Sequence, residues 1–255
     1  MTYRHIVCDR GDAIATITMN RPERRNALSF EHIEELIDAL GAVAASDARV
    51  VILAANGPVF CAGHDYGDMA ERDLAGFRTL FARCAEMMTL VQSIPQPVVA
   101  SVQGIATGAG CQLGATADLA VASEQASFAT PGGRGGWFCS TPMVAVSRAI
   151  GRKRALEMLL TGDAIDATTA AEWGLVNRVV PAERLQEETE KLAHAASRGS
   201  TASKAVGKQA FYAQIDLDQA HAYTYASEVM ATTAVAPDGR EAIASFSEKR
   251  KPVYR

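Results

Sequence analysis

Residues 103 to 113 read Gln-Gly-Ile-Ala-Thr-Gly-Ala-Gly-Cys-Gln-Leu, and the fold prediction starts from this stretch. It follows the apolar segment 97–102, a pattern typical of a strand that leads into a helix. The first backbone amides of a helix have no partner within the helix, and the helix dipole favours negative charge there. With only small side chains nearby, these amides can reach a substrate oxygen. The same glycines would equally suit close packing of the helix on a sheet.

A second loop of small residues favours the first interpretation. Residues 59 to 65 read Val-Phe-Cys-Ala-Gly-His-Asp and follow an apolar strand at 50–53. Together, the two loops resemble those of the enoyl-CoA hydratase/isomerase (crotonase) family, in which one main-chain amide from each loop binds a thioester carbonyl. The resemblance implies that the backbone nitrogens of His64 and Ala109 are the donors here, and that Ala62 and His64 contact the coenzyme A thioester.

The resemblance extends over nearly the whole chain. It includes Asn-Arg-Pro-Glu-Arg-Arg-Asn-Ala-Leu at 20–28, Ala-Asp-Leu-Ala at 117–120 and Phe-Ser-Glu-Lys-Arg at 246–250. It implies an α/β fold in which a crotonase-like ββα spiral over 1–181 binds acyl-CoA and a helical region over 182–255 follows. Because such helices pack against neighbouring subunits in the family, the resemblance also implies a homotrimer or a dimer of trimers.

Local patterns predict alternating strands and helices up to about Pro181. Alternation and apolar runs predict strands at 6–9, 13–19, 50–54, 97–102, 119–123 and 176–180, with a turn at Arg10-Gly11-Asp12. One helix is predicted after an N-cap at Ser29 and a second over 74–91. A third follows the small-residue loop after the strand at 97–102 and ends near residue 116. Beyond Pro181 the apolar residues keep a helical spacing, which predicts three helices over 182–248.

Composition narrows the possible classes of protein. The chain has 255 residues, of which 48% are hydrophobic and 21% charged, as in globular proteins with a substantial core. No apolar stretch has the length of a membrane span and the first residues do not resemble a secretory signal, so we expect a cytoplasmic protein. The net charge of −4 argues against general nucleic-acid binding. The five cysteines are widely separated, which indicates free thiols and no metal site.

Coenzyme A carries phosphates at one end, so its site needs cations at the entrance. Arg21, Arg24 and Arg25 form a local basic patch, and Lys249 lies near the end of the chain. By resemblance, Arg24 and Arg25 bind the phosphates, and Lys249 of a neighbouring subunit supports them. Each of these charges taken alone would equally suit a solvated surface. No cofactor is expected apart from coenzyme A as part of the substrate.

Three residues depart from the family pattern. Many relatives have a lysine where this chain has Gly67, which removes one phosphate contact. In the family, one glutamate activates water and a second protonates the α-carbon. Their positions hold Gln112 and Gly132. An amide does not exchange a proton near neutral pH and glycine has no side chain, so we expect hydration to be weak or redirected.

Other side chains could take over part of the chemistry. The imidazole of His64 titrates near working pH, and the run Ala-Gly-His-Asp is similar to the first loop of methylmalonyl-CoA decarboxylases. If the ring points away, only the amide of His64 acts. Ser140 or Cys139 could hold a water or a substrate carboxylate, whereas nucleophilic catalysis by Cys139 would need a lowered thiol pKa and a nearby base. Asp65 resembles a position that turns the loop by binding backbone amides.

Three hypotheses of different class follow from these residues. The preferred one is an acyl-CoA lyase or isomerase that polarises the thioester through His64 and Ala109 and uses Gln112, Ser140 or substrate groups for the remaining steps. The second is a decarboxylase of a malonyl-type thioester, which needs no carboxylate base. The third is a protein that binds acyl-CoA without turnover.

Overall fold

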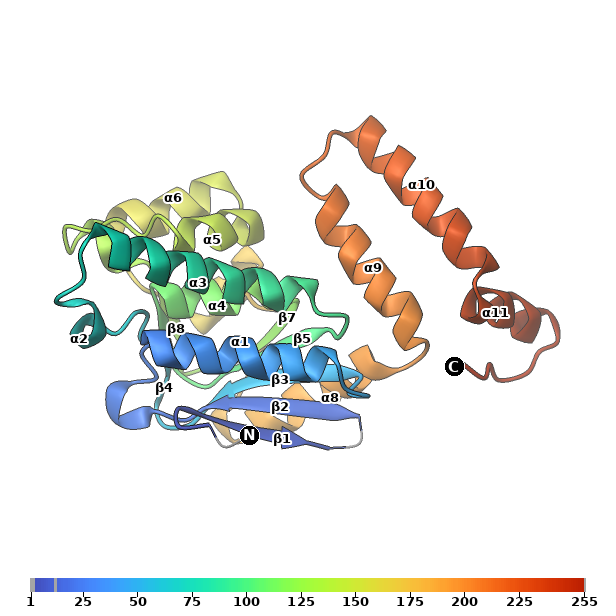
Figure 1. The fold of residues 1–255 in the computed structure, drawn as a ribbon, viewed down its shortest axis with the longest axis horizontal. Helices are drawn as coiled ribbons and strands as arrows, with labels where there is room; N and C mark the ends of the chain where they lie inside the picture. Colours follow the sequence, from blue (N-terminus) through green and yellow to red (C-terminus); the bar gives the residue numbers. More distant parts are fainter. Residues whose placement is uncertain (1–2, 12, 255) are drawn as a thin grey trace.

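The computed structural model describes residues 3–11 and 13–254. A six-stranded sheet runs through the body of the protein in the order β1-β2-β3-β5-β7-β10 (Figure 1). Only the β1–β2 pair is antiparallel, and the other neighbours in this sheet are parallel. Its strands are β1 (Ile6–Arg10), β2 (Ile14–Met19), β3 (Val50–Ala55), β5 (Val98–Val102), β7 (Leu119–Ser123) and β10 (Arg178–Val180).

A second, smaller sheet carries the loops that were singled out in the sequence. Its order is β4-β6-β8-β9, and β4, β6 and β8 are parallel to one another. The strands are β4 (Val59–Cys61), β6 (Ile105–Thr107), β8 (Ser127–Ala129) and β9 (Ile165–Asp166). Since the carboxyl ends of neighbouring parallel strands lie at one edge of a sheet, the loops after β4 and β6 emerge side by side.

Helices cover both faces of the larger sheet. They are α1 (Phe30–Ala44), α2 (Tyr66–Met69), α3 (Leu74–Ser93), α4 (Ala109–Thr116), α5 (Pro142–Ile150), α6 (Arg152–Thr161), α7 (Ala167–Trp173), α8 (Leu185–Ser197), α9 (Thr201–Gln214), α10 (Gln219–Val235) and α11 (Pro237–Ser247). None of the helices in the described residues is long and apolar enough to cross a bilayer.

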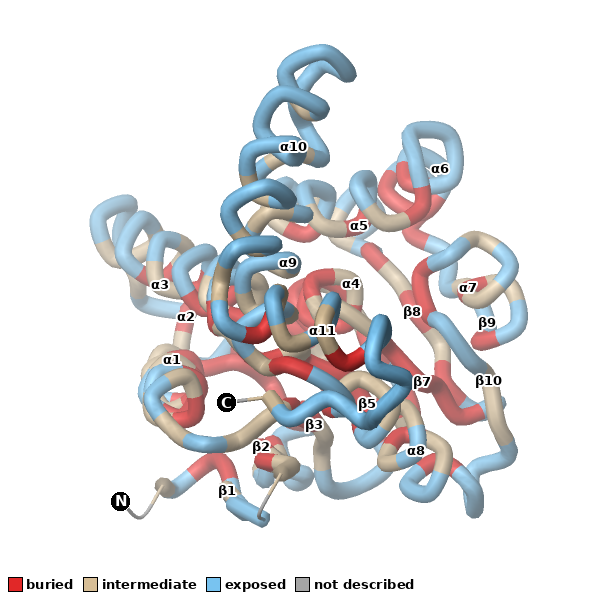
Figure 2. Tube along the Cα trace, turned by 90° about the vertical axis from the view of Figure 1, so that its right-hand side faces the viewer, coloured by how far each residue is buried: buried red, intermediate tan, exposed pale blue. Residues whose placement is uncertain are grey.

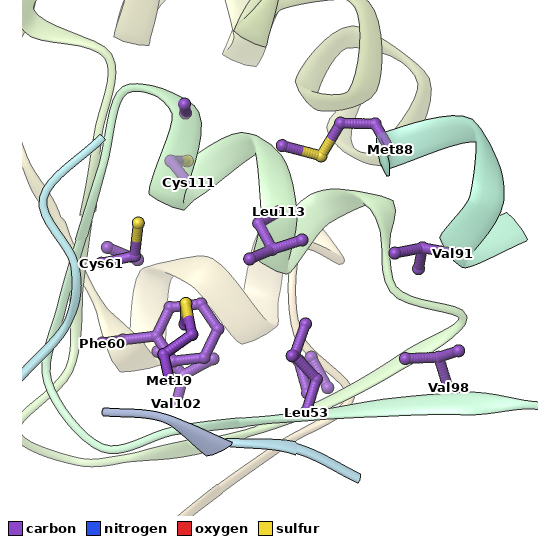
Figure 3. Packing of buried hydrophobic residues seen from close by; sticks show 14 of the residues in the cluster. Met19, Leu53, Phe60, Cys61, Met88, Val91, Val98, Val102, Cys111 and Leu113 are labelled. Atoms are coloured by element: carbon purple, nitrogen blue, oxygen red, sulfur yellow. The ribbon is translucent and has the colours of Figure 1, made fainter. Parts of the chain in front are cut away.

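The main core lies between the sheets and the helices α1, α3 and α4. Met19, Leu53 and Val102 from the larger sheet point toward Phe60 of β4 and Leu113 of α4 (Figure 3). A smaller cluster on the opposite face joins strands β3 and β5 to Ala193 of α8. Burial of apolar side chains on both sheet faces therefore explains the continuous apolar runs of β3 and β5 in the sequence.

Most of the predicted elements are present. The strands predicted at 6–9, 13–19, 50–54 and 97–102 are present as β1, β2, β3 and β5. The Ser29 cap is also confirmed, since its side chain accepts a hydrogen bond from the backbone nitrogen of His32. Asp12 of the predicted turn lies outside the described residues. The sequence did not predict the short strands β6, β8 and β9, because two or three residues are too few to set up an alternating pattern.

The prediction of three C-terminal helices was wrong, because four helices, α8 to α11, occupy this region. Helix α8 packs on β3, β5 and β7 as part of the body, whereas α9, α10 and α11 extend away from it (Figure 1). Every residue of α9 and α10 is described, and none of them is buried when backbone and side chain are taken together (Figure 2). The division at residue 181 stays a prediction.

One buried ionic junction attaches α9 to the body. The ammonium of Lys208 lies 2.6 Å from a carboxylate oxygen of Asp118, and it donates hydrogen bonds of 2.8 Å to the carbonyls of Val91 and Gln96. The hydroxyl of Tyr212 donates to the other carboxylate oxygen at 2.7 Å. The Lys208 side chain is only 7% exposed, so its charge depends on these partners.

We predict that Lys208→Met lowers the free energy of unfolding by about 3 kcal/mol, because it leaves a buried carboxylate without its counter-charge. Urea unfolding measures the change. Lys153→Met on the exposed start of α6 is the matched control and should stay within about 0.5 kcal/mol of the wild type. Equal stability of the two variants would show that the junction contributes nothing.

The ring of His32 provides a second buried polar group with a measurable consequence. It is fully buried on α1, with Nδ1 3.2 Å from the carbonyl oxygen of Ala27. Burial lowers its pKa from 6.5 to about 4. Between these two pH values the unfolded chain binds the proton and the folded chain does not, so stability falls as the pH falls from 6.5 to 4.

We predict that His32→Leu removes about 3 kcal/mol of this pH-dependent loss, which is the energy equivalent of the pKa shift. The free energy of unfolding is to be measured from pH 4 to pH 8 in both proteins. His194→Leu on an exposed face of α8 controls for the loss of a histidine. If the free energy of unfolding of His32→Leu changes between pH 4 and pH 8 by as much as that of the wild type, the assignment is contradicted.

Candidate functional site

A cavity of about 400 Å³ opens where the loops after β4 and β6 meet. The segment between β8 and α5 and one residue of α3 complete its wall. Its lining consists of Ala27, Ala62, Gly63, His64, Asp65, Tyr66, Phe81, Thr107, Gly108, Ala109, Pro131, Gly132, Trp137, Phe138, Cys139, Ser140, Thr141 and Pro142. Three of the four residues predicted to be catalytic, His64, Ala109 and Ser140, therefore share one cavity.

The two loops touch backbone to backbone. A Cβ atom on Gly110, in the first turn of α4, would lie 2.1 Å from the carbonyl oxygen of Cys61 at the end of β4. A Cβ atom on Gly63 would lie 3.3 Å from the backbone nitrogen of Ala109. Small residues are therefore required for the close approach of the loops, and this approach brings His64 and Ala109 together.

The backbone nitrogens of His64 and Ala109 are both free. Leu28 pairs with the residues on either side of His64, since its amide donates to Gly63 and its carbonyl accepts from Asp65. The first bond within α4 runs from the amide of Gln112 to the carbonyl of Gly108 and leaves the amide of Ala109 without an intrahelical partner. Within residues 3–11 and 13–254, neither nitrogen donates a hydrogen bond.

His64 is one of the residues that line the cavity, and its ring makes an edge contact with Phe81, with 5.4 Å between the ring centroids. Neither ring nitrogen has a hydrogen-bond partner among the described residues. Burial lowers the pKa of His64 to about 4, against a smaller opposing effect of the Leu28 carbonyl. The expectation that this imidazole titrates near working pH was therefore wrong, because the ring is neutral at pH 7.

The cavity wall offers no free carboxylate. Among the lining residues, all of which are described, the one carboxylate belongs to Asp65. Its oxygens accept from the Arg21 guanidinium at 2.8 Å and from the Gly67 amide at 2.9 Å. Burial would raise the pKa of Asp65, but these two donors hold it below its usual range. Asp65 thus has the loop-turning role expected of it and remains ionised and paired.

Gln112 and Gly132, which the resemblance places at the two glutamate positions, lie in different surroundings. Gln112 is 5% exposed, it does not line the cavity, and its side-chain oxygen has no partner among the described residues. Gly132 lines the cavity, but a Cβ atom there would lie 2.1 Å from the carbonyl oxygen of Trp137. The present course of the 131–141 segment therefore depends on the absence of a side chain at position 132.

The basic residues are only partly available. The expectation that Arg21 belongs to an open basic patch was wrong, because its guanidinium is bound to Asp65 and 15% exposed. Arg24 and Arg25 are exposed, and their role at the phosphates stays a prediction. Lys249 is also exposed and follows α11, on the other side of the chain from α2 (Figure 1). Its role at the coenzyme A of a neighbouring subunit stays a prediction.

The segment after β8 supplies a hydroxyl and a thiol. The hydroxyl of Ser140 lines the cavity and lies 3.4 Å from the carbonyl of Phe138. The sulfur of Cys139 accepts from the Gly132 amide at 3.3 Å, and burial raises the pKa of its thiol. Cys139 therefore lacks the lowered pKa that nucleophilic catalysis requires.

The sequence did not identify Phe81 and Phe77 as part of the site. Both belong to α3, and Phe81 reaches the cavity and stacks on Phe77 with 5.8 Å between centroids. Trp137 lies 5.6 Å from Phe81 and completes the aromatic group. The spacing of four residues between the two phenylalanines was the available signal, but it cannot distinguish core from cavity wall.

Comparison with known proteins agrees with this geometry. Residues 9–255 match the family described as enoyl-CoA hydratase/isomerase. The crystal structure of an enoyl-CoA hydratase from Mycobacterium smegmatis is similar, with a TM-score of 0.95 and 45% identity over 98% of each chain. That of human enoyl Coenzyme A hydratase domain-containing protein 3 has a TM-score of 0.94 and 42% identity over 98% of this chain and 100% of the other. The crotonase-like α/β fold is confirmed.

Curated relatives correct one expectation. The rat enoyl-CoA hydratase domain-containing protein 3 is 44% identical over 245 residues, which cover 95% of this chain and 82% of the relative. It is named mitochondrial, as are its mouse, frog, human and zebrafish counterparts. The expectation of a cytoplasmic location is contradicted by these names. The Escherichia coli 2,3-dehydroadipyl-CoA hydratase is 30% identical over 98% of both chains.

The family match over residues 9–255, the similar structures and the two adjoining loops lead to one conclusion: the chain belongs to the enoyl-CoA hydratase/isomerase family.

Proposed function

We propose that the protein is an enzyme that binds an acyl-CoA thioester in the cavity and holds its carbonyl oxygen between the backbone nitrogens of His64 and Ala109. One observation carries the proposal: two unpaired amides from adjoining loops belong to residues that line the same cavity. Coenzyme A enters as part of the substrate. Its acyl end lies against the aromatic side chains, and its phosphates lie near Arg24 and Arg25 at the entrance.

The two amides would act by withdrawing electron density from the thioester. A donor placed where negative charge develops contributes about 2.7 to 4 kcal/mol to catalysis. Ala109 is the first residue of α4, so the positive end of the helix dipole adds to its effect. Such a site stabilises an enolate oxygen whatever step produces the enolate. Both donors are main-chain groups, so they do not depend on the residue type at either position.

Hydration by the family's usual route requires more than this. Each general acid or base contributes roughly 10²- to 10⁴-fold in rate. Asp65 is the one carboxylate in the described cavity wall and is paired with Arg21, while Gln112 is buried away from the wall. We therefore propose an acyl-CoA lyase or isomerase with weak or redirected hydratase activity, in which Ser140 or the substrate supplies the remaining polar contacts.

A second candidate is decarboxylation of a malonyl-type thioester. Loss of carbon dioxide produces the enolate without a base. The apolar wall favours this step, because the substrate carboxylate is poorly solvated beside Phe81 and Trp137. Release of carbon dioxide from malonyl-CoA or methylmalonyl-CoA would decide for this reaction. Binding without turnover of any acyl-CoA would decide for a non-catalytic role.

We also propose that the chain assembles into a homotrimer or a dimer of trimers. Support comes from apolar side chains that α10 and α11 leave in solvent, among them Met230 at 75% and Phe246 at 87% exposure. Exposed apolar faces of this kind mark surfaces for protein contact. In such an assembly Lys249 of one subunit would lie near the coenzyme A of another.

We predict that bound crotonyl-CoA labelled with ¹³C at its carbonyl shows a stretching band at lower wavenumber than in water, because two amides polarise the carbonyl. Infrared difference spectroscopy makes the measurement. Gly110→Ala should reduce the shift, since the added Cβ displaces the first turn of α4 from Cys61. Gly207→Ala has no atom within 4 Å of the added Cβ and is the matched control. A wild-type band at the position found in water rules out the proposed binding mode.

We further predict that the wild type hydrates crotonyl-CoA slowly, and that Gly132→Glu does not restore the reaction. The new side chain would collide with the Trp137 carbonyl, so this variant should also unfold at a lower temperature. Gln112→Glu, which adds a carboxylate without this collision, is the companion variant. The loss of the double-bond absorbance of crotonyl-CoA gives the rate. Rapid hydration by the wild type contradicts the role assigned to the missing glutamates.

A further inference from the structure

One buried ammonium joins three elements that lead to the cavity. Asp118 follows the end of α4, and one of its carboxylate oxygens accepts a hydrogen bond of 2.6 Å from the backbone nitrogen of Val98, the first residue of β5. The same oxygen lies 2.6 Å from the ammonium of Lys208, which also donates to the carbonyls of Val91 in α3 and Gln96 before β5. The end of α4, the start of β5 and the end of α3 therefore meet at one side chain of α9.

Each of the three elements forms part of the cavity wall or leads into it. Helix α3 contributes Phe81, β5 continues through β6 to Gly108, and α4 begins with Ala109. Neither Asp118 nor Lys208, both among the described residues, lines the cavity. The eight residues of α4 separate its first amide from the junction by about 12 Å. The junction can therefore affect a bound molecule only through the position of these elements.

The backbone from Val98 to Asp118 forms a closed unit with the small-residue loop at its far end. The hydrogen bond between these two residues closes the unit on one side. On the other side, Gly110 packs against the carbonyl of Cys61, which leaves α4 no room to shift toward β4. Because α4 is a short buried helix held at both ends, a displacement of its carboxyl end tilts it and moves the amide of Ala109. An amide donor is effective only at about 2.7 to 3.1 Å from the oxygen it stabilises, so a small tilt weakens the contact.

The chemistry of Lys208 suits a positioning role better than a simple attachment of α9. An ammonium has three N–H donors and no acceptor. Lys208 places them on three acceptors from different parts of the chain, and its side chain is only 7% exposed. Desolvation of a buried ion pair offsets most of what the pair gains, so an apolar contact would attach α9 at least as well. An apolar side chain, however, could not hold two carbonyls and a carboxylate at defined distances.

We infer that Lys208 is a positioning residue for the acyl-CoA site, which holds α4 and α3 so that the amide of Ala109 and the ring of Phe81 face the acyl group. This inference rests on the proposed function, because it concerns the geometry of the same thioester contact. Helix α9 thereby shapes the site without touching the ligand. Loss of Lys208 should weaken the carbonyl contact and spare the phosphates, since Arg24 and Arg25 belong to none of the three elements.

Lys204 on the same helix provides a matched comparison. Its ammonium also attaches α9 to the body, through the carbonyls of Ala196 in the last turn of α8 and Arg198 just beyond it. Helix α8 packs on β3, β5 and β7, and none of its residues, all of which are described, lines the cavity. Replacing Lys204 therefore loosens α9 without releasing α4 or α3.

Calorimetry with crotonyl-CoA and free coenzyme A tests the inference. The measured quantity is the ratio of the dissociation constant of coenzyme A to that of crotonyl-CoA, which isolates the contribution of the acyl group. In Lys208→Met we expect this ratio to fall roughly 2- to 10-fold, the equivalent of one lost hydrogen bond. In Lys204→Met it should stay as in the wild type. An unchanged ratio in Lys208→Met, or an equal fall in both variants, overturns the inference.

A double variant separates positioning from stability. Lys208→Met leaves the carboxylate of Asp118 unpaired. Adding Asp118→Asn removes this charge, so the double variant should regain much of the stability lost in urea unfolding. The ties to the carbonyls of Val91 and Gln96 stay broken, and the ratio should remain low. If stability and ratio both return to the wild-type values, the junction acts on stability alone and the inference is wrong.

Infrared spectra of bound crotonyl-CoA, labelled with ¹³C at its carbonyl, separate the inference from the proposed function. We expect the downward shift of the carbonyl band to be smaller in Lys208→Met than in the wild type and unchanged in Lys204→Met. If the wild type shows the shift and Lys208→Met keeps it in full, only the inference fails. If the wild type shows no shift, the proposed function itself fails.

Discussion

The contact between the first turn of α4 and the end of β4 determines the geometry of the site. A Cβ atom on Gly110 would lie 2.1 Å from the Cys61 carbonyl, so α4 can approach β4 only without a side chain there. The parallel pairing of β4 with β6 already places their carboxyl ends side by side, and Ala106 pairs with Cys61. The contact then fixes how far the amide of Ala109 stands from that of His64. Small residues in both loops are thus a packing requirement and, through it, a requirement of the site.

Elements with a long periodic pattern could be predicted from the sequence, and short ones could not. Helices α1 and α3 repeat an apolar face over several turns, whereas β9 has two residues and carries no period. Among site residues, His64 and Ala109 followed from the resemblance of the two loops to those of the family. The protonation of His64 did not follow, because its lowered pKa arises from burial beside residues distant in the sequence, such as Phe81. For the same reason the pairing of Arg21 with Asp65 was hidden.

The site holds polar groups whose bonds are incomplete within the chain. The amides of His64 and Ala109 and the ring nitrogens of His64 all lack partners among the described residues. Each such group, once buried, costs about 1 to 3 kcal/mol relative to a hydrogen-bonded one. The surrounding structure must offset this cost, and the core beneath the loops, with Phe60 and Phe128 fully buried, is placed to do so. A ligand that completes these bonds recovers part of the same energy as affinity.

The segment between β8 and α5 sets the character of the cavity wall. Gly132 is enclosed by the Trp137 carbonyl and by the sulfur and the amide of Cys139, so the turn that carries Trp137 into the wall passes through the space a side chain would fill. The amide of Gly132 donates to the Cys139 sulfur, which holds the turn in this position. Trp137 then lies against Phe81 and makes the wall apolar. The absence of a side chain at position 132 and the position of Trp137 in the wall therefore belong to one arrangement of this segment. A wall of this kind disfavours an activated water and favours steps that need only a polarised thioester.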